Sequence, residues 1–137
     1  MPGHAFSYAV VRVVPRVERE EFVNVGVIVF CAERRWLGCK LAPDSARLRA
    51  LAPDVDAAEI ARHLEGVRAV CAGEAAAGPI AALPPSERFH WLVAPRSTAI
   101  QTSAVHSGIA EDPAAALERL YDKLVAAARA GGSAQPS

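Results

Sequence analysis

The chain has 137 residues, 52% of them hydrophobic, and its 15 basic and 15 acidic side chains give a formal net charge of zero. This length fits one globular domain, and the hydrophobic fraction excludes a disordered chain. A zero net charge gives no electrostatic support for binding nucleic acid or an anionic membrane surface, so we expect neither as a partner. No apolar stretch is long enough to span a bilayer, and the three cysteines form no Cys-x-x-Cys pair. We therefore expect a cytoplasmic protein with reduced thiols, in which residues 1–130 form a single domain and residues 131–137 a disordered tail.

The first forty residues predict a meander of three antiparallel strands. β-branched residues dominate residues 6–14, and Pro15 ends this strand. The second strand, within residues 21–31, is hydrophobic at both alternating sets of positions, which is typical of a central strand covered on both faces. Strict alternation would place one set on a single face: Val23, Val25, Val27 and Val29. Residues 36–42 return as the third strand.

Two finer predictions concern the register of these strands. A turn centred on Arg35 would place Cys31 opposite Cys39, where both are expected to be small buried residues. Arg12 and Asn24 would share one face of the sheet, but a shift of one residue would place them on opposite faces.

Two helices are predicted in the middle of the chain. Asp44 can cap a short helix that Pro53 ends, and a second helix begins near Asp54 or Asp56. The second helix carries an apolar stripe of Ala57, Ile60, Leu64, Val67 and Cys71. Its other face, with Glu59, Arg62, His63 and Glu65, is typical of a solvated helix surface.

The last third of the chain predicts two strands and a helix. Residues 88–94 alternate aromatic and aliphatic side chains as a strand, and residues 97–105 can form another. Asp112 then caps the final helix, with Pro113 at its first position. The helix buries a stripe of Leu117, Leu120, Tyr121, Leu124, Val125 and Ala128. This order of elements predicts an α+β fold, with an antiparallel sheet of about five strands packed against two or three helices.

The densest group of polar side chains lies around the later strand, at Arg96, Ser97, Thr98, Gln101, Ser103, His106 and Ser107. An arginine followed by hydroxyl groups suits a phosphate or a carboxylate, and Gly26 would allow a ligand or a neighbouring backbone to approach Asn24. The residues expected to bind a ligand or partner are Arg96, Ser97, Gln101, Ser103, His106 and Asn24. The alternative is a pair of polar loops beside an edge strand.

The chain contains no phosphate loop, dinucleotide fingerprint, zinc-protease motif or nucleophile elbow. A catalytic triad could be formed by Ser103 or Ser97 as nucleophile, His106 as base and Glu111 or Asp112 as the acidic residue, but no elbow or oxyanion hole accompanies them. His90 and His106 lack further ligands, so neither a metal nor a cofactor is expected.

Two blocks of sequence resemble one bacterial family, the domain-of-unknown-function family 3037 (DUF3037). They are "YAVVRVVPRVEREEFVNVGVIVFC", from Tyr8 to Cys31, and "RSTAIQTSAVHSGIAEDPAAALERLYDKLV", from Arg96 to Val125. The positions that match the family pattern are Glu21, Asn24, Gly26, Arg96, Ser97, Thr98, Gln101, Ser103 and His106. The resemblance implies an accessory protein that is a candidate partner or regulator of a kinase resembling the HipA toxin kinases.

Two functional hypotheses follow. The first is a small accessory module that binds a protein partner through the edge of its sheet and the segment from Arg96 to Ser107. The second is a binding domain or enzyme for a phosphorylated or nucleotide-like small molecule, with Arg96 as anion clamp and His106 as acid or base. Convergence of the polar side chains on a pocket would favour the ligand, and a flat edge would favour the partner.

Overall fold

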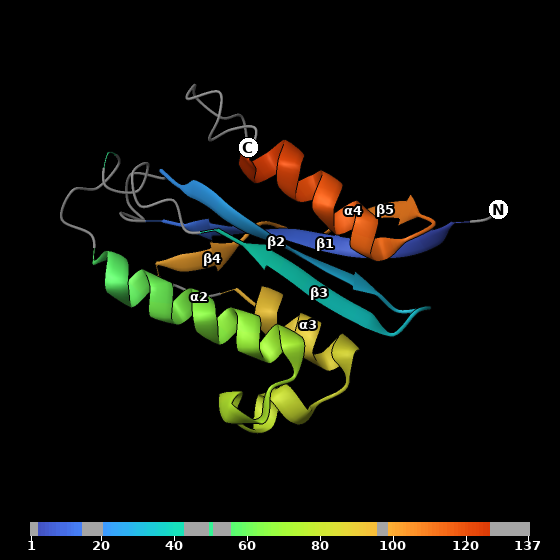
Figure 1. The fold of residues 1–137 in the computed structure, drawn as a ribbon, viewed down its shortest axis with the longest axis horizontal. Helices are drawn as coiled ribbons and strands as arrows, with labels where there is room; N and C mark the ends of the chain where they lie inside the picture. The colour runs from blue at the N-terminus through green and yellow to red at the C-terminus, as the bar shows by residue number, and fades with distance from the viewer. Residues whose placement is uncertain (1–2, 15–20, 43–49, 51–55, 96–98, 127–137) are drawn as a thin grey trace.

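The structure, a computed structural model, describes residues 3–14, 21–42, 50, 56–95 and 99–126. It has the predicted α+β fold, in which a five-stranded antiparallel sheet packs against three helices (Figure 1). The helix predicted between Asp44 and Pro53 falls almost wholly outside the described residues, as does the tail at 131–137.

The sheet is built around β1 (His4–Val13), the longest strand. On one side β1 pairs with β2 (Val23–Cys31), which in turn pairs with β3 (Trp36–Leu41). On its other side β1 pairs with two short strands in succession, β4 (Ile100–Thr102) along its second half and β5 (His106–Ala110) along its first half. The predicted meander is therefore confirmed.

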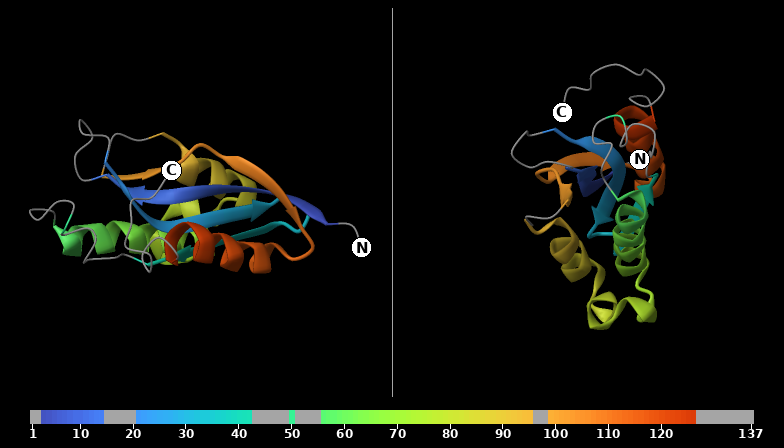
Figure 2. Two further views of the ribbon diagram at one scale, coloured as in Figure 1. Left: turned by 90° about the horizontal axis from the view of Figure 1, so that it is seen from above. Right: turned by 90° about the vertical axis from the view of Figure 1, so that its left-hand side faces the viewer.

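Helices cover both faces of the sheet because β1 and β2 are apolar on both faces. One core cluster joins the strands to the helices α2 (Ala57–Ala72) and α3 (Pro85–Val93), and a second joins them to α4 (Pro113–Tyr121). In the right-hand view of Figure 2, α4 lies above α2 and α3. The central position predicted for the second strand is confirmed.

The strict alternation predicted for β2 is wrong because a β-bulge interrupts it. β1 pairs Val11 with Gly26 but Arg12 with Asn24, so one residue of β2 is left over. Val25 consequently faces α2 and α3, whereas Val27, two positions later, faces α4. A Cβ atom on Gly26 would lie 2.8 Å from the Lys40 carbonyl oxygen, so the glycine allows β3 to approach closely.

The predicted pairing of Cys31 with Cys39 is also wrong. The turn spans residues 32–35, with Arg35 in the left-handed region at φ 50°, so Cys31 pairs with Trp36. Cys39 lies instead against Cys71 of α2, and a hydrogen bond between their thiols lowers the pKa of Cys39 and raises that of Cys71.

α2 begins where predicted, because the Asp56 carboxylate accepts a hydrogen bond from the Glu59 N–H, and it ends at Gly73 in the left-handed conformation. Two short 3₁₀ turns, η2 (Ala75–Ala77) and η3 (Pro79–Ala82), connect it to α3.

α3 replaces the strand predicted at residues 88–94. Pro85 occupies its first turn, and Phe89 and Leu92, three residues apart, are buried on one side. Trp91 is left 42% exposed on another side. The fifth strand is β5, which follows β4 after a short break.

α4 is capped by Asp112, whose carboxylate accepts a hydrogen bond from the Ala114 N–H. It continues as one turn of π-helix, η4 (Asp122–Ala126). As predicted, the last helix buries Leu117, Tyr121 and Val125. Within the described residues, no helix is both long and apolar enough to cross a membrane.

Candidate functional site

The structure tests four of the six residues predicted to bind a ligand or partner, because Arg96 and Ser97 lie outside the described residues. It places Gln101 on β4, Ser103 in the break between β4 and β5, His106 at the start of β5, and Asn24 on β2.

Ser103 completes the hydrogen bonding of the sheet where β4 stops. Its backbone N–H donates to the Val10 carbonyl at 2.8 Å, and its hydroxyl oxygen accepts from the Val10 N–H at 2.9 Å. The hydroxyl also donates to the Ala104 carbonyl at 2.8 Å. Ser103 therefore joins two short strands into one edge, and its buried hydroxyl is hydrogen-bonded to backbone groups.

The serine triad considered from the sequence is not assembled around Ser103. His106 lies across from Tyr8, with the two rings 5.4 Å apart, and it is exposed. Asp112 is occupied as the cap of α4. Among the described residues no group of three metal-ligating side chains gathers.

Asn24 and Gln101 do share a row, and Arg12 lies between them. β1 pairs Arg12 with Asn24 on one side and with Gln101 on the other, so the three side chains lie on the same face of the sheet. This row lies on the face covered by α4 and η4, because the Asn24 amide donates to the Leu124 carbonyl at 3.2 Å. Of the two arrangements that the sequence leaves open, the structure has the one in which Arg12 and Asn24 share a face.

The row combines a buried donor with a buried acceptor. Arg12 lies over the Phe22 ring at 4.2 Å, and burial lowers the pKa of its guanidinium. Its Nε–H and the Asn24 Oδ1 are both buried and have no hydrogen-bond partner among the residues that the structure describes. The Arg12 Nε–H is a donor and the Asn24 Oδ1 is an acceptor, so together they could bind the C=O and N–H groups of an amide.

His106 does not join this row. It pairs with Tyr8, four positions along β1 from Arg12, so the described members of the predicted set do not all line one hollow. A cavity of about 260 Å³ lies beside Gln101, with Thr102, Ser103 and Val105 in its wall. It is smaller than most pockets that hold a drug-sized ligand, which measure roughly 300–1,000 Å³.

The outer edge of the sheet is formed by β4, the break after it, and β5. Both strands pair with β1, and no other strand of the described residues pairs with their outer side. Two large hydrophobic side chains are exposed here, Val105 at 46% and Ile109 at 75%. We call residues 100–110 the outer edge.

These two hydrophobic side chains were not among the predicted binding residues. Ile109 pairs with Ala5 and therefore lies on the face opposite α4, as does Ser107, which pairs with Ser7. The signal available in the sequence was the alternation of Val105, Ser107 and Ile109, which places the three on one face of an extended strand.

The family described as "Protein of unknown function (DUF3037)" matches residues 8–125. No curated protein and no solved structure matches the chain. The match spans every strand and helix of the fold except the first residues of β1 and the last residue of η4. The chain therefore belongs to the DUF3037 family.

Proposed function

We propose that this protein is a cytoplasmic accessory module that binds an extended segment of a protein partner along its outer edge. The partner class that the family resemblance implies is a HipA-like kinase. The observation that carries the proposal is the exposure of Ile109 and Val105 beside strands that, in the described part of the chain, are paired on one side alone.

Strand addition explains why this edge suits a protein. A strand paired on one side still presents backbone N–H and C=O groups on the other, and an extended peptide can bind them as a further strand. Side chains then add specificity at alternate positions, which on this edge carry Val105, Ser107 and Ile109. Exposed apolar residues on an unprotected edge otherwise promote aggregation, so a partner that covers them would lower the tendency of the protein to aggregate.

The alternative is a phosphorylated or nucleotide-like ligand held by Arg96 and His106. It is less well supported, because Gln101 and His106 pair with β1 residues four positions apart and the cavity beside Gln101 is small. Small-molecule sites usually enclose most of their ligand, whereas a partner segment binds along an open edge.

A binding measurement with a purified HipA-like kinase of the same organism tests the proposal. We expect isothermal titration to detect a complex with the wild-type chain, and Ile109→Lys to weaken it by about tenfold or more, since lysine on an edge strand opposes strand addition. The matched control is Ala61→Lys, which adds the same charge on the exposed surface of α2. An absence of binding by the wild type, or equal weakening by both lysine variants, would contradict the proposal.

A further inference from the structure

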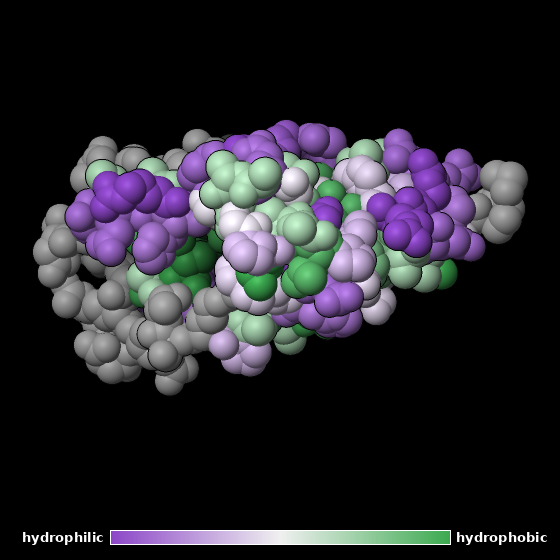
Figure 3. Space-filling view, turned by 90° about the horizontal axis from the view of Figure 1, so that it is seen from below, coloured by the Kyte–Doolittle hydropathy of each residue, from purple (hydrophilic) through white to green (hydrophobic). Residues whose placement is uncertain are grey.

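A hollow lies between α2, α3 and β4, with Ile100 of the outer edge in its wall. It measures about 750 Å³, within the range of small-molecule sites. Its hydrophobic wall includes Val67, Val70, Trp91 and Ile100. Figure 3 shows a hollow with hydrophobic side chains at its floor and hydrophilic side chains beside it. We call it the α2–α3 groove.

Gly66 gives this groove part of its width. It lies in the middle of α2 and lines the groove, and a Cβ atom built on it would meet nothing within 4 Å. Its φ is not positive and no neighbouring atom requires a glycine, although glycine destabilises a helix interior relative to alanine. The effect of this residue on the described structure is therefore to leave room above the helix.

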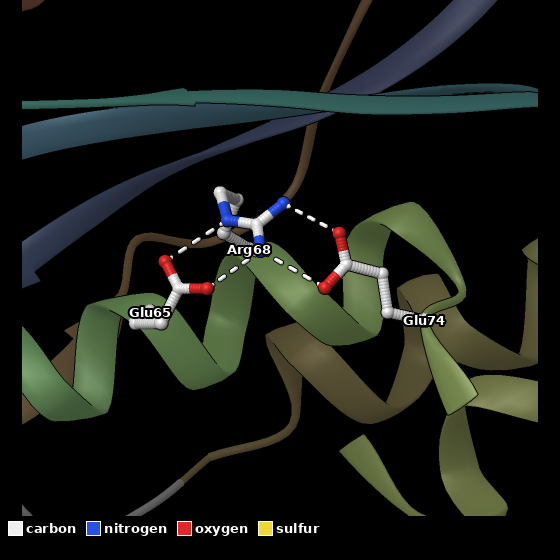
Figure 4. A network of polar contacts seen from close by, with 3 residues as sticks. All are labelled: Glu65, Arg68 and Glu74. Carbon is white, nitrogen blue, oxygen red and sulfur yellow. Dashed lines mark hydrogen bonds and ion pairs between the residues drawn. The ribbon is translucent and has the colours of Figure 1, made fainter. Parts of the chain in front are cut away.

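Two arginines and two glutamates at the rim sum to zero charge, but both carboxylates are paired with Arg68 and neither is paired with Arg62. The two carboxylates there, Glu65 and Glu74, are both bound by Arg68, with four N–O distances between 2.5 and 3.0 Å (Figure 4). Their hydrogen bonds to Arg68 lower the pKa of both carboxyl groups and raise that of the guanidinium. Arg62 also lines the groove, and within the described residues it makes no ion pair or hydrogen bond. It is the rim cation left available to a ligand.

We propose that the α2–α3 groove binds a small amphipathic anion, such as a medium-chain carboxylate. Arg62, Gly66 and Val70 follow one another at intervals of four residues, so they lie in one row along α2. The anionic group binds Arg62 at one end of this row, and the apolar body lies over Gly66 against Val70 and the exposed indole of Trp91. The groove shares Ile100 with the outer edge but includes neither Val105 nor Ile109.

Titration of the full chain with decanoate, followed by calorimetry and tryptophan fluorescence, tests this proposal. We expect one decanoate to bind per chain and to change the emission of Trp91, measured in a Trp36→Phe background. Gly66→Leu, which fills the space above the helix, is expected to weaken binding by about tenfold or more. Arg62→Gln is expected to weaken it by several-fold.

The variants also separate loss of the site from loss of the fold. Leucine forms helices better than glycine, so Gly66→Leu is expected to melt at or above the wild-type temperature while it loses decanoate. Decyltrimethylammonium, which has the same chain and the opposite charge, is expected to bind at least about tenfold more weakly than decanoate. Failure of the wild type to bind decanoate, undiminished binding by Gly66→Leu, or equal binding of the two amphiphiles would overturn the proposal.

Discussion

Replacement of Ser103 by alanine tests the role that the structure gives this residue at the break between β4 and β5. The change removes the oxygen that accepts the Val10 N–H at 2.9 Å. Both residues are buried, with Val10 6% and Ser103 8% exposed, so the N–H is left without a partner and away from water. An unsatisfied buried donor costs about 1–3 kcal/mol. In a domain of this size such a loss lowers the melting temperature by roughly 3–10 °C.

Urea denaturation of Ser103→Ala measures this free energy, with Ser107→Ala as the control because that serine is exposed on the same edge. We expect the control to change the free energy of unfolding by less than about 0.5 kcal/mol. Hydrogen exchange should also be faster at the Val10 amide in Ser103→Ala. If the two variants are equally stable and the Val10 amide stays protected, the bridging role of Ser103 is wrong.

Three further outcomes follow from the geometry. Gly26→Ala should destabilise the protein by about 1–3 kcal/mol, because the new Cβ would meet a backbone oxygen of β3, and thermal melting would show it. Arg68→Met should raise the pKa of the two carboxyl groups it binds, as NMR titration can measure. In the folded protein the pKa values of Glu65 and Glu74 are lowered, so these carboxylates contribute stability above pH 4.5. This stability is lost as the pH falls through their lowered pKa values. Cys39 should be alkylated before Cys71, because its pKa is lowered and it is less buried, as peptide mass mapping would test.

The first three strands and the starts of α2 and α4 could be predicted from the sequence because the information for them is local. The β-branched run of β1, the double-sided apolar pattern of β2 and the caps Asp56 and Asp112 each identify an element without reference to the rest of the chain. α3 could not be assigned in this way, because aromatic residues that alternate over seven positions fit a short strand as well as a helix. Pro85 at the start of the helix was the signal that outweighed this alternation.

The register of the strands and the exposure of their side chains depend on long-range contacts that the local sequence does not indicate. The bulge beside Asn24 redirects half of β2, and nothing local marks it except Gly26. The polar segment predicted a binding site, yet the structure uses Ser103 to complete the sheet. The most exposed large hydrophobic residue on the outer edge is instead Ile109. Whether a side chain faces a neighbour or the solvent is decided by the pairing of β5 with β1, which is a long-range contact.

Amide hydrogen exchange of the full chain, with and without a purified HipA-like kinase, tests the proposed docking along the outer edge most directly. We predict that the kinase slows exchange within β5, from His106 to Ala110, and in the segment that precedes it. Exchange on the exposed surface of α2 should be unchanged. Protection confined to α2, or no protection at concentrations at which the two proteins form a complex, would contradict the account.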